Sequence, residues 1–137
     1  MSNNDDLLLA VNGTLMRGLA LNANLLAVAA SFVREDVTEP SYRMWSIGDR
    51  HPAMQRVHEG GHGLALEIWR VPPAGLAQVL LQEPPGLCVG KVVLASGEEV
   101  LGVLGEAWLC AGQREISGYG GWRAYCAAAT GRAALLT

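Results

Sequence analysis

The chain is 137 residues long, which predicts a single domain. Half of its residues are hydrophobic, enough to form a core, and its net charge of −3 with scattered Lys and Arg argues against non-specific nucleic-acid binding. Its three cysteines have no CxxC spacing, which argues against a disulfide framework and a zinc site and favours a reducing, cytoplasmic location.

Neither a targeting segment nor a membrane span is expected. The first six residues are polar and acidic, unlike a signal peptide. The longest apolar stretch, Leu19 to Val33, is interrupted by two asparagines and is shorter than the roughly 20 apolar residues of a membrane span. We therefore expect one domain over residues 1–137, with flexible ends at 1–6 and 130–137.

The chain opens with a strand, a glycine-bounded loop and a helix. Leu7–Val11 is continuously apolar, Asn12–Gly18 forms the loop, and Leu21–Ala30 is rich in Ala and Leu. Such a loop points backbone N–H groups outward at the positive end of a helix dipole. It can therefore hold a carboxylate or a phosphate, with Arg17 as an added cation. The alternative is a plain tight turn.

The rest of the chain predicts mostly strands. Strands are expected at Ser31–Thr38, Tyr42–Ile47, Gly63–Val71, Leu87–Ala95 and Glu98–Cys110. A helix is expected over Ala74–Gln82, loops over Gly48–Gly61 and Ala111–Glu115, and a last helix after a glycine-rich turn, ending at Gly131. Taken together, the elements predict an α+β fold, a small curled sheet or barrel with helices packed outside.

The three histidines lie in or beside one polar segment. His58 and His62 would share a face only on a helix, and the intervening Glu59-Gly60-Gly61 breaks a helix. We therefore expect no metal site here.

Two glutamates stand in segments that are otherwise apolar. Glu67 shares a strand face with Ala65 and Trp69, and Glu106 precedes Ala107-Trp108. Each is either an outward, solvated glutamate or a partly buried carboxylate with a raised pKa that lines a cavity and moves a proton.

Five segments together resemble a known family. Gly13–Asn22 is similar to a Gly-x-x-Leu-x-Gly-x-x-Leu-Asn opening, and Glu115–Tyr125 to a closing Asp-Ile-Thr-x-Phe-Gly-Gly-Trp-Arg-Ala-Tyr segment. Further matches are Tyr42–Trp45, Glu67–Pro72 and Pro84–Gly90. Over residues 7 to 127 the chain thus resembles the C-terminal domain of allophanate hydrolase, a branch of the gamma-glutamylcyclotransferase-like superfamily.

This resemblance implies a gamma-glutamylcyclotransferase-like fold, a small mixed barrel or curled sheet with flanking helices. It also implies substrate binding by backbone N–H groups of the glycine loop. In allophanate hydrolases this domain is assigned decarboxylation of N-carboxycarbamate, the product of the amidase step, a reaction of nitrogen metabolism that needs no cofactor.

Two departures from the wider pattern limit the function. The Ser–Ser–Lys amidase set of allophanate hydrolases has no counterpart in this chain. Pro85 stands where cyclotransferases carry their general acid/base glutamate, and proline cannot move a proton. We therefore expect no cyclisation of gamma-glutamyl substrates unless Glu67, Glu83 or Glu106 takes over.

The leading hypothesis is a protein that binds a small carboxylated urea or amide metabolite, a cofactor-independent lyase of the N-carboxycarbamate type. The alternatives are an atypical cyclotransferase and a non-catalytic module that binds a partner amidase or forms a homodimer. The expected catalytic residues are Glu67, Glu106 and His62, with His58 as a further proton donor. The expected binding residues are Asn12, Gly13, Thr14, Leu15, Arg17, Tyr119 and Arg123. We also expect Arg123 to pair with Glu67 or Glu106 and to tie the last helix to the sheet.

Overall fold

The computed structural model describes residues 5–136, and side-chain surroundings up to residue 130. Its elements are β1 (Leu7–Val11), α1 (Asn22–Ala27), β2 (Ser31–Val37), β3 (Tyr42–Ile47), β4 (His51–Arg56), β5 (Ala65–Val71), α2 (Pro73–Gln82), β6 (Leu87–Val93), β7 (Glu99–Gly105), α3 (Ala107–Cys110), β8 (Arg114–Glu115), the short helix η1 (Ser117–Tyr119) and α4 (Trp122–Leu136). The order agrees with the expected α+β fold.

The strands form two sheets. The larger sheet has the order β2-β5-β1-β7-β6 and the smaller one β4-β3-β8, so the described strands form no closed barrel. β1 lies in the middle of the larger sheet, antiparallel to β5 and parallel to β7. Because β1 is flanked by strands on both edges and its last three residues are buried, its sequence is continuously apolar.

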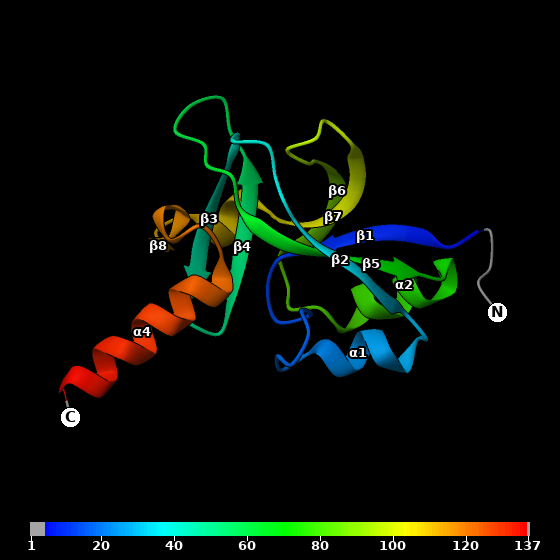
Figure 1. Cartoon of the computed structure of the whole chain (residues 1–137), viewed down its shortest axis with the longest axis horizontal. Helices are drawn as coiled ribbons and strands as arrows, with labels where there is room; N and C mark the ends of the chain where they lie inside the picture. Colours follow the sequence, from blue (N-terminus) through cyan, green and yellow to red (C-terminus); the bar gives the residue numbers. More distant parts are fainter. Residues whose placement is uncertain (1–4, 137) are drawn as a thin grey trace.

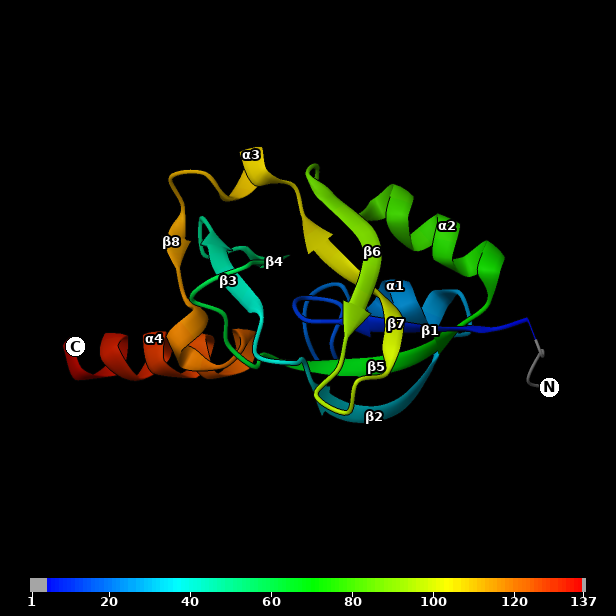
Figure 2. The same ribbon diagram turned by 90° about the horizontal axis from the view of Figure 1, so that it is seen from above.

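The helices lie at different places around the two sheets (Figures 1 and 2). α1 and α2 lie together on one side of the larger sheet, and α4 extends from the smaller sheet toward the end of the molecule opposite the start of β1. A side chain at Gly75 of α2 would come within 2.8 Å of Cβ of Val28, so this glycine lets the two helices approach closely. None of the described helices is long and apolar enough to cross a membrane.

One hydrophobic core joins the two sheets. It contains Ile68 of β5, Met44 of β3 and Tyr125 of α4, all at most 2% exposed. A smaller cluster of Ile47, Ala53, Leu109 and Cys110 packs α3 against the smaller sheet.

One expected loop is partly a strand. Within Gly48–Gly61, predicted to be irregular, His51–Arg56 forms β4 and pairs with the whole of β3. Its first four residues are all buried, so no alternation marks it as a strand, and Pro52 lowers its strand propensity. Proline is tolerated because β4 is the edge strand of the smaller sheet.

Three further predictions are corrected by the structure. The chain leaves the strand after Gly105 and forms α3, because Leu109 and Cys110 turn back to bury themselves beside β3 and β4. The expected loop at 111–115 contains the short β8, which pairs with β3. The last helix continues past Gly131 to Leu136. Of the ends predicted to be flexible, residues 1–4 and 137 lie outside the described part.

Candidate functional site

The loop that follows β1 is braced by two asparagine side chains. We call residues Asn12–Leu15 the amide loop. The side-chain amide of Asn12 donates to the carbonyl of Val103, 2.9 Å away, and that of Asn22 donates to the carbonyl of Leu15 at 2.8 Å. Both asparagines are at most 9% exposed, so these bonds form away from water and fix the loop against β7 and α1.

The carbonyls of the amide loop are used, but its N–H groups are not. The carbonyls of Gly13 and Thr14 accept from the backbone of Met16 and Leu21. Among the described residues, no acceptor receives the N–H groups of Gly13, Thr14 or Leu15. Three backbone donors of the amide loop therefore have no acceptor within the described part of the chain, and they precede α1, which begins only at Asn22.

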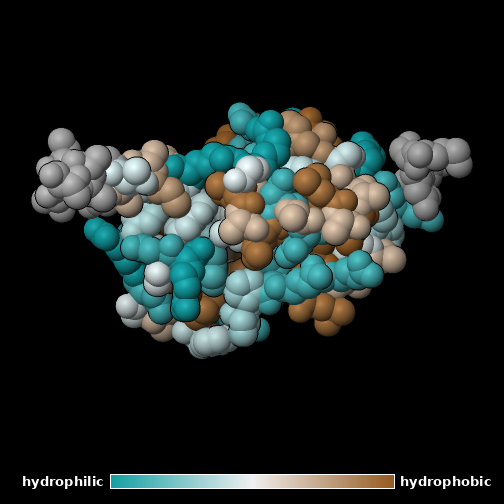
Figure 3. Space-filling view, turned by 90° about the horizontal axis from the view of Figure 1, so that it is seen from below, coloured by the Kyte–Doolittle hydropathy of each residue, from teal (hydrophilic) through white to brown (hydrophobic). Residues whose placement is uncertain are grey.

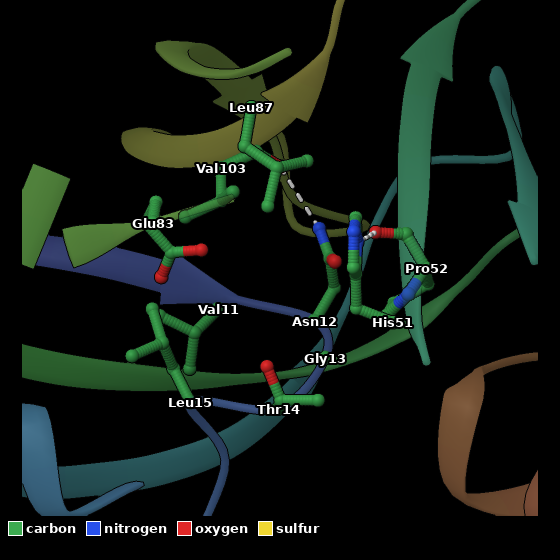
Figure 4. Close-up of a pocket in the computed structure, with 10 residues that line it drawn as sticks. All are labelled: Val11, Asn12, Gly13, Thr14, Leu15, His51, Pro52, Glu83, Leu87 and Val103. Carbon is green, nitrogen blue, oxygen red and sulfur yellow. Dashed lines mark hydrogen bonds between the residues drawn. The ribbon is translucent and has the colours of Figure 1, made fainter. Parts of the chain in front are cut away.

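These residues line a small cavity, which we call the amide pocket (Figure 4). Its other walls are His51 and Pro52 of β4, Glu83 after α2, Val11 of β1, and Leu87 and Val103 of the sheet. The centre of a water-sized sphere can move through only about 10 Å³ of it, roughly the room for one water molecule. The pocket therefore accepts one small functional group.

Glu83 is the acid of this pocket. Its Oε1 is buried and has no hydrogen-bond partner, and Figure 4 shows its carboxyl group on the side of the pocket opposite His51. Burial raises the pKa of Glu83 from its ordinary value of 4.5 to about 7. At neutral pH the group is therefore divided between acid and carboxylate, the condition that suits a proton donor.

His51 also lines the pocket, and its hydrogen bond to the backbone determines which ring nitrogen carries a proton. Its Nδ1 lies 3.1 Å from the carbonyl of Pro52, which can only accept, so Nδ1 carries a proton. In the neutral ring Nε2 is then an acceptor.

Glu67, expected to be catalytic, lies in a different cluster. Its carboxylate is 2% exposed and accepts from the Arg17 backbone at 2.9 Å, the Arg17 guanidinium at 3.0 Å and the Trp69 indole at 3.1 Å. Arg123 donates to the same carboxylate at 3.2 Å, which confirms the expected Arg123 pairing.

Glu67 is buried and lines a cavity of about 270 Å³, as one of the two interpretations expected, but its pKa is lowered and not raised. Burial alone would raise it, but the hydrogen bonds from Arg17, Trp69 and Arg123 outweigh that effect. Glu67 therefore remains ionised and acts as the anchor of these donors. Arg17 also pairs with Glu35 and stacks 3.7 Å from the Phe32 ring, so its guanidinium is held away from the amide pocket.

The other expected residues are not brought together. Glu106 is exposed at the start of α3 and accepts from the Trp108 indole, and Tyr119 packs edge-on against Tyr125. His62 is exposed, and its backbone forms a bridge with Tyr42. None of these three side chains lines the amide pocket.

The set of expected site residues omitted Glu83 and His51. Glu83 had a signal, since it lies two residues before Pro85 in the segment that resembles the acid-bearing segment of cyclotransferases. Nothing in the sequence marks His51, because its position depends on the pairing of β4 with β3.

Comparison with known proteins assigns the family. A family model of the allophanate hydrolase C-terminal domain matches residues 7–127. The chain belongs to this family. The urea amidolyase of Lachancea kluyveri is 30% identical over 132 residues, which are 91% of this chain and 7% of that protein. The chain thus spans a small fraction of the curated relatives it matches.

Solved structures agree with this assignment. The protein c4763, described as specific to uropathogenic E. coli, is 57% identical with a TM-score of 0.88, over 89% of this chain and 96% of that one. The Kluyveromyces lactis allophanate hydrolase is 27% identical with a TM-score of 0.83, over 91% of this chain and 22% of that one. An AIG2-like protein from Mus musculus, 20% identical with a TM-score of 0.60 over 80% of this chain and 82% of that one, shares the fold. The fold is therefore gamma-glutamylcyclotransferase-like, as the resemblance implied.

Proposed function

We propose that the amide pocket binds one carboxylate of a small carboxylated urea or amide metabolite and that Glu83 supplies the proton for its decarboxylation. The observation that carries this proposal is the buried, unpartnered Oε1 of Glu83, which shares a pocket with three unused backbone N–H groups. Donors and a protonated acid together suit an anionic ligand.

For an N-carboxycarbamate the step balances as follows. The amide loop holds the carboxylate that stays, and the C–N bond to the other carboxylate breaks, so that CO2 leaves. The electron pair of that bond remains on nitrogen, which takes the proton of Glu83, and the product is carbamate. Glu83 regains its proton from solvent, which a pKa of about 7 permits near neutral pH.

The substrate would come from a separate amidase-type reaction. The relatives named urea amidolyase and allophanate hydrolase are far longer than this chain, which spans 7% and 22% of them. We propose that this domain takes the product of such an amidase-type step.

Malonate is a stable probe of the binding step, because a methylene replaces the nitrogen between its two carboxylates. Malonate should raise the melting temperature of the protein, and a crystal grown with it should show a carboxylate on the N–H groups of Gly13–Leu15. Chloride at equal ionic strength is the control. A malonate bound elsewhere, with these N–H groups unoccupied, would contradict the binding site.

The chemical step is tested with an allophanate-cleaving amidase as the source of substrate. The protein should accelerate CO2 release above the rate with the amidase alone, and Glu83→Gln should lower that acceleration about 100-fold or more, the usual contribution of a general acid. Glu106→Gln and His62→Gln are matched controls and should retain it. A Glu83→Gln variant with full activity would disprove the role of Glu83 as proton donor. If the wild-type protein bound malonate but did not accelerate CO2 release, decarboxylation would be disproved and only the binding function would stand.

A further inference from the structure

A second, larger cavity lies directly beside the amide pocket. It has a volume of about 500 Å³, and Thr14 and His51 line both cavities. We call it the apolar groove. It lies between the loop that leads into α1, the turn between β3 and β4, and α3. A volume of this size is typical of a small-molecule site, whereas the amide pocket alone has room for one functional group.

The walls of the apolar groove are mostly hydrophobic. They include Leu21, Ile47, Pro85 and Leu109, together with the indole of Trp108. Trp108 is 62% exposed, although so large an apolar side chain is usually covered. Its indole N–H donates to Glu106, which orients the ring while leaving it open to a ligand. Figure 3, viewed from the side where α1 and the β3–β4 turn lie, shows hydrophobic side chains interspersed with hydrophilic ones.

Arg50 is the cation of the groove. Its backbone N–H donates to Ile47, but no carboxylate within the described part of the chain forms an ion pair with its guanidinium. By contrast, Arg17, Arg34, Arg43, Arg56 and Arg123 each have an acidic partner. Arg50 therefore keeps its donors available at the edge of an apolar cavity.

We infer that the two cavities form one extended site for a ligand with three parts. A carboxylate or carboxylated amide occupies the amide pocket, an aromatic or branched apolar body lies in the groove on Trp108, and a second anionic group meets Arg50. This inference rests on the proposed function only for the head group. It extends the substrate class from small urea derivatives to larger N-carboxylated or carboxylic compounds with an apolar body.

Three probes separate these parts: malonate, 3-phenylpropanoate and 3-(4-carboxyphenyl)propanoate. Dissociation constants from calorimetry should fall in that order. Replacing one carboxylate of malonate by a benzyl group, as in 3-phenylpropanoate, should tighten binding about tenfold through burial against Trp108. The carboxylate added to the ring should tighten binding about tenfold again, through a charge-assisted contact with Arg50. Both aromatic probes should compete with malonate, because all three place a carboxylate in the amide pocket.

Two variants assign the contacts. Trp108→Ala should weaken both aromatic probes about fivefold or more and leave malonate unchanged. Arg50→Gln should weaken only 3-(4-carboxyphenyl)propanoate and leave malonate and 3-phenylpropanoate unchanged, and Arg70→Gln, an exposed arginine on β5, is the matched control. Both substituted side chains are exposed, so the variants should fold normally.

The outcomes separate this inference from the proposed function. Aromatic probes that bind no more tightly than malonate, that do not compete with it, or that ignore both substitutions would overturn the extended site while leaving decarboxylation at the amide pocket intact. Conversely, tight binding of 3-(4-carboxyphenyl)propanoate that is weakened by Arg50→Gln would support the extended site even if no CO2 release were observed.

Discussion

The guanidinium of Arg123, in the first turn of α4, lies 3.2 Å from the carboxylate of Glu67 on β5. The same guanidinium nitrogen donates to the backbone carbonyl of Arg17. The last helix, the larger sheet and the loop before α1 are thus joined at one buried carboxylate. This cluster holds these three parts of the fold together, and Glu67, Arg17 and Arg123 do not line the amide pocket.

Replacement of Arg123 by Ala should destabilise the protein by about 1–2 kcal/mol. The loss is moderate because Arg123 is half exposed and Glu67 keeps Arg17 and Trp69 as donors. Urea denaturation measures it, and Arg70→Ala, an exposed arginine on the strand that carries Glu67, is a control that should change stability little. Equal midpoints for the two variants would mean that the Arg123 pair contributes nothing.

Glu67→Gln should cost about 2–4 kcal/mol at neutral pH, because two arginines then lose their buried carboxylate. The folded pKa of Glu67 is lowered, so its contribution is present above the unfolded pKa and disappears as pH falls through the folded pKa. The difference between wild type and variant should therefore shrink in acid. A difference that stays constant down to about pH 3 would show that the carboxylate charge is not responsible.

Glu83 should show the opposite pH dependence. Its folded pKa of about 7 lies above its ordinary 4.5, so the folded state binds more protons between these values and stability falls as pH rises through them. The full shift corresponds to about 3 kcal/mol, of which we expect roughly half because Glu83 is only partly buried. Glu83→Gln should remove this loss and be more stable than wild type at pH 8, as thermal unfolding from pH 4 to 8 would reveal.

Gly13→Ala should destabilise the protein by about 1–3 kcal/mol and abolish malonate binding. A Cβ at this position would lie 2.5 Å from Cδ of Pro52, so the amide loop would have to move. Gly118→Ala is the matched control, since nothing lies within 4 Å of its Cβ position. Malonate binding retained in Gly13→Ala would indicate that the loop N–H groups are not the ligand donors.

No 5-oxoproline should be released from gamma-glutamyl amino acids or glutathione. Pro85, at the position expected for the cyclotransferase acid, lines the apolar groove and has no proton to transfer. Chromatographic assay of 5-oxoproline against a buffer blank checks this. Turnover that disappears in Glu83→Gln would show instead that Glu83 performs the cyclotransferase reaction.

The sequence predicted most elements because their patterns are local. The apolar run of β1, the alternation of β3 and the proline at the start of α2 each have one structural interpretation. β4 was missed because its first four residues are all buried, which leaves the segment with no periodicity, and α3 because four residues are too few for a helical repeat.

The site was predicted only in part, for a related reason. The amide loop follows from its position between a strand and a helix. Which glutamate belongs to the candidate site does not follow from the sequence, because Glu67 and Glu83 differ in the groups that surround them in the fold rather than in their neighbours along the chain. Four donors keep Glu67 charged, whereas the buried oxygen of Glu83 has none.

The close approach of Gly13 and Pro52 places a steric constraint on two positions that are distant in the sequence. The proline ring fills the space that a side chain at position 13 would need, and it belongs to the edge strand of the other sheet. A bulkier residue at 13 thus requires a smaller one at 52. Relatives that keep the Gly–Pro pair should retain this loop geometry, and those in which only one member changes should have a differently shaped binding site.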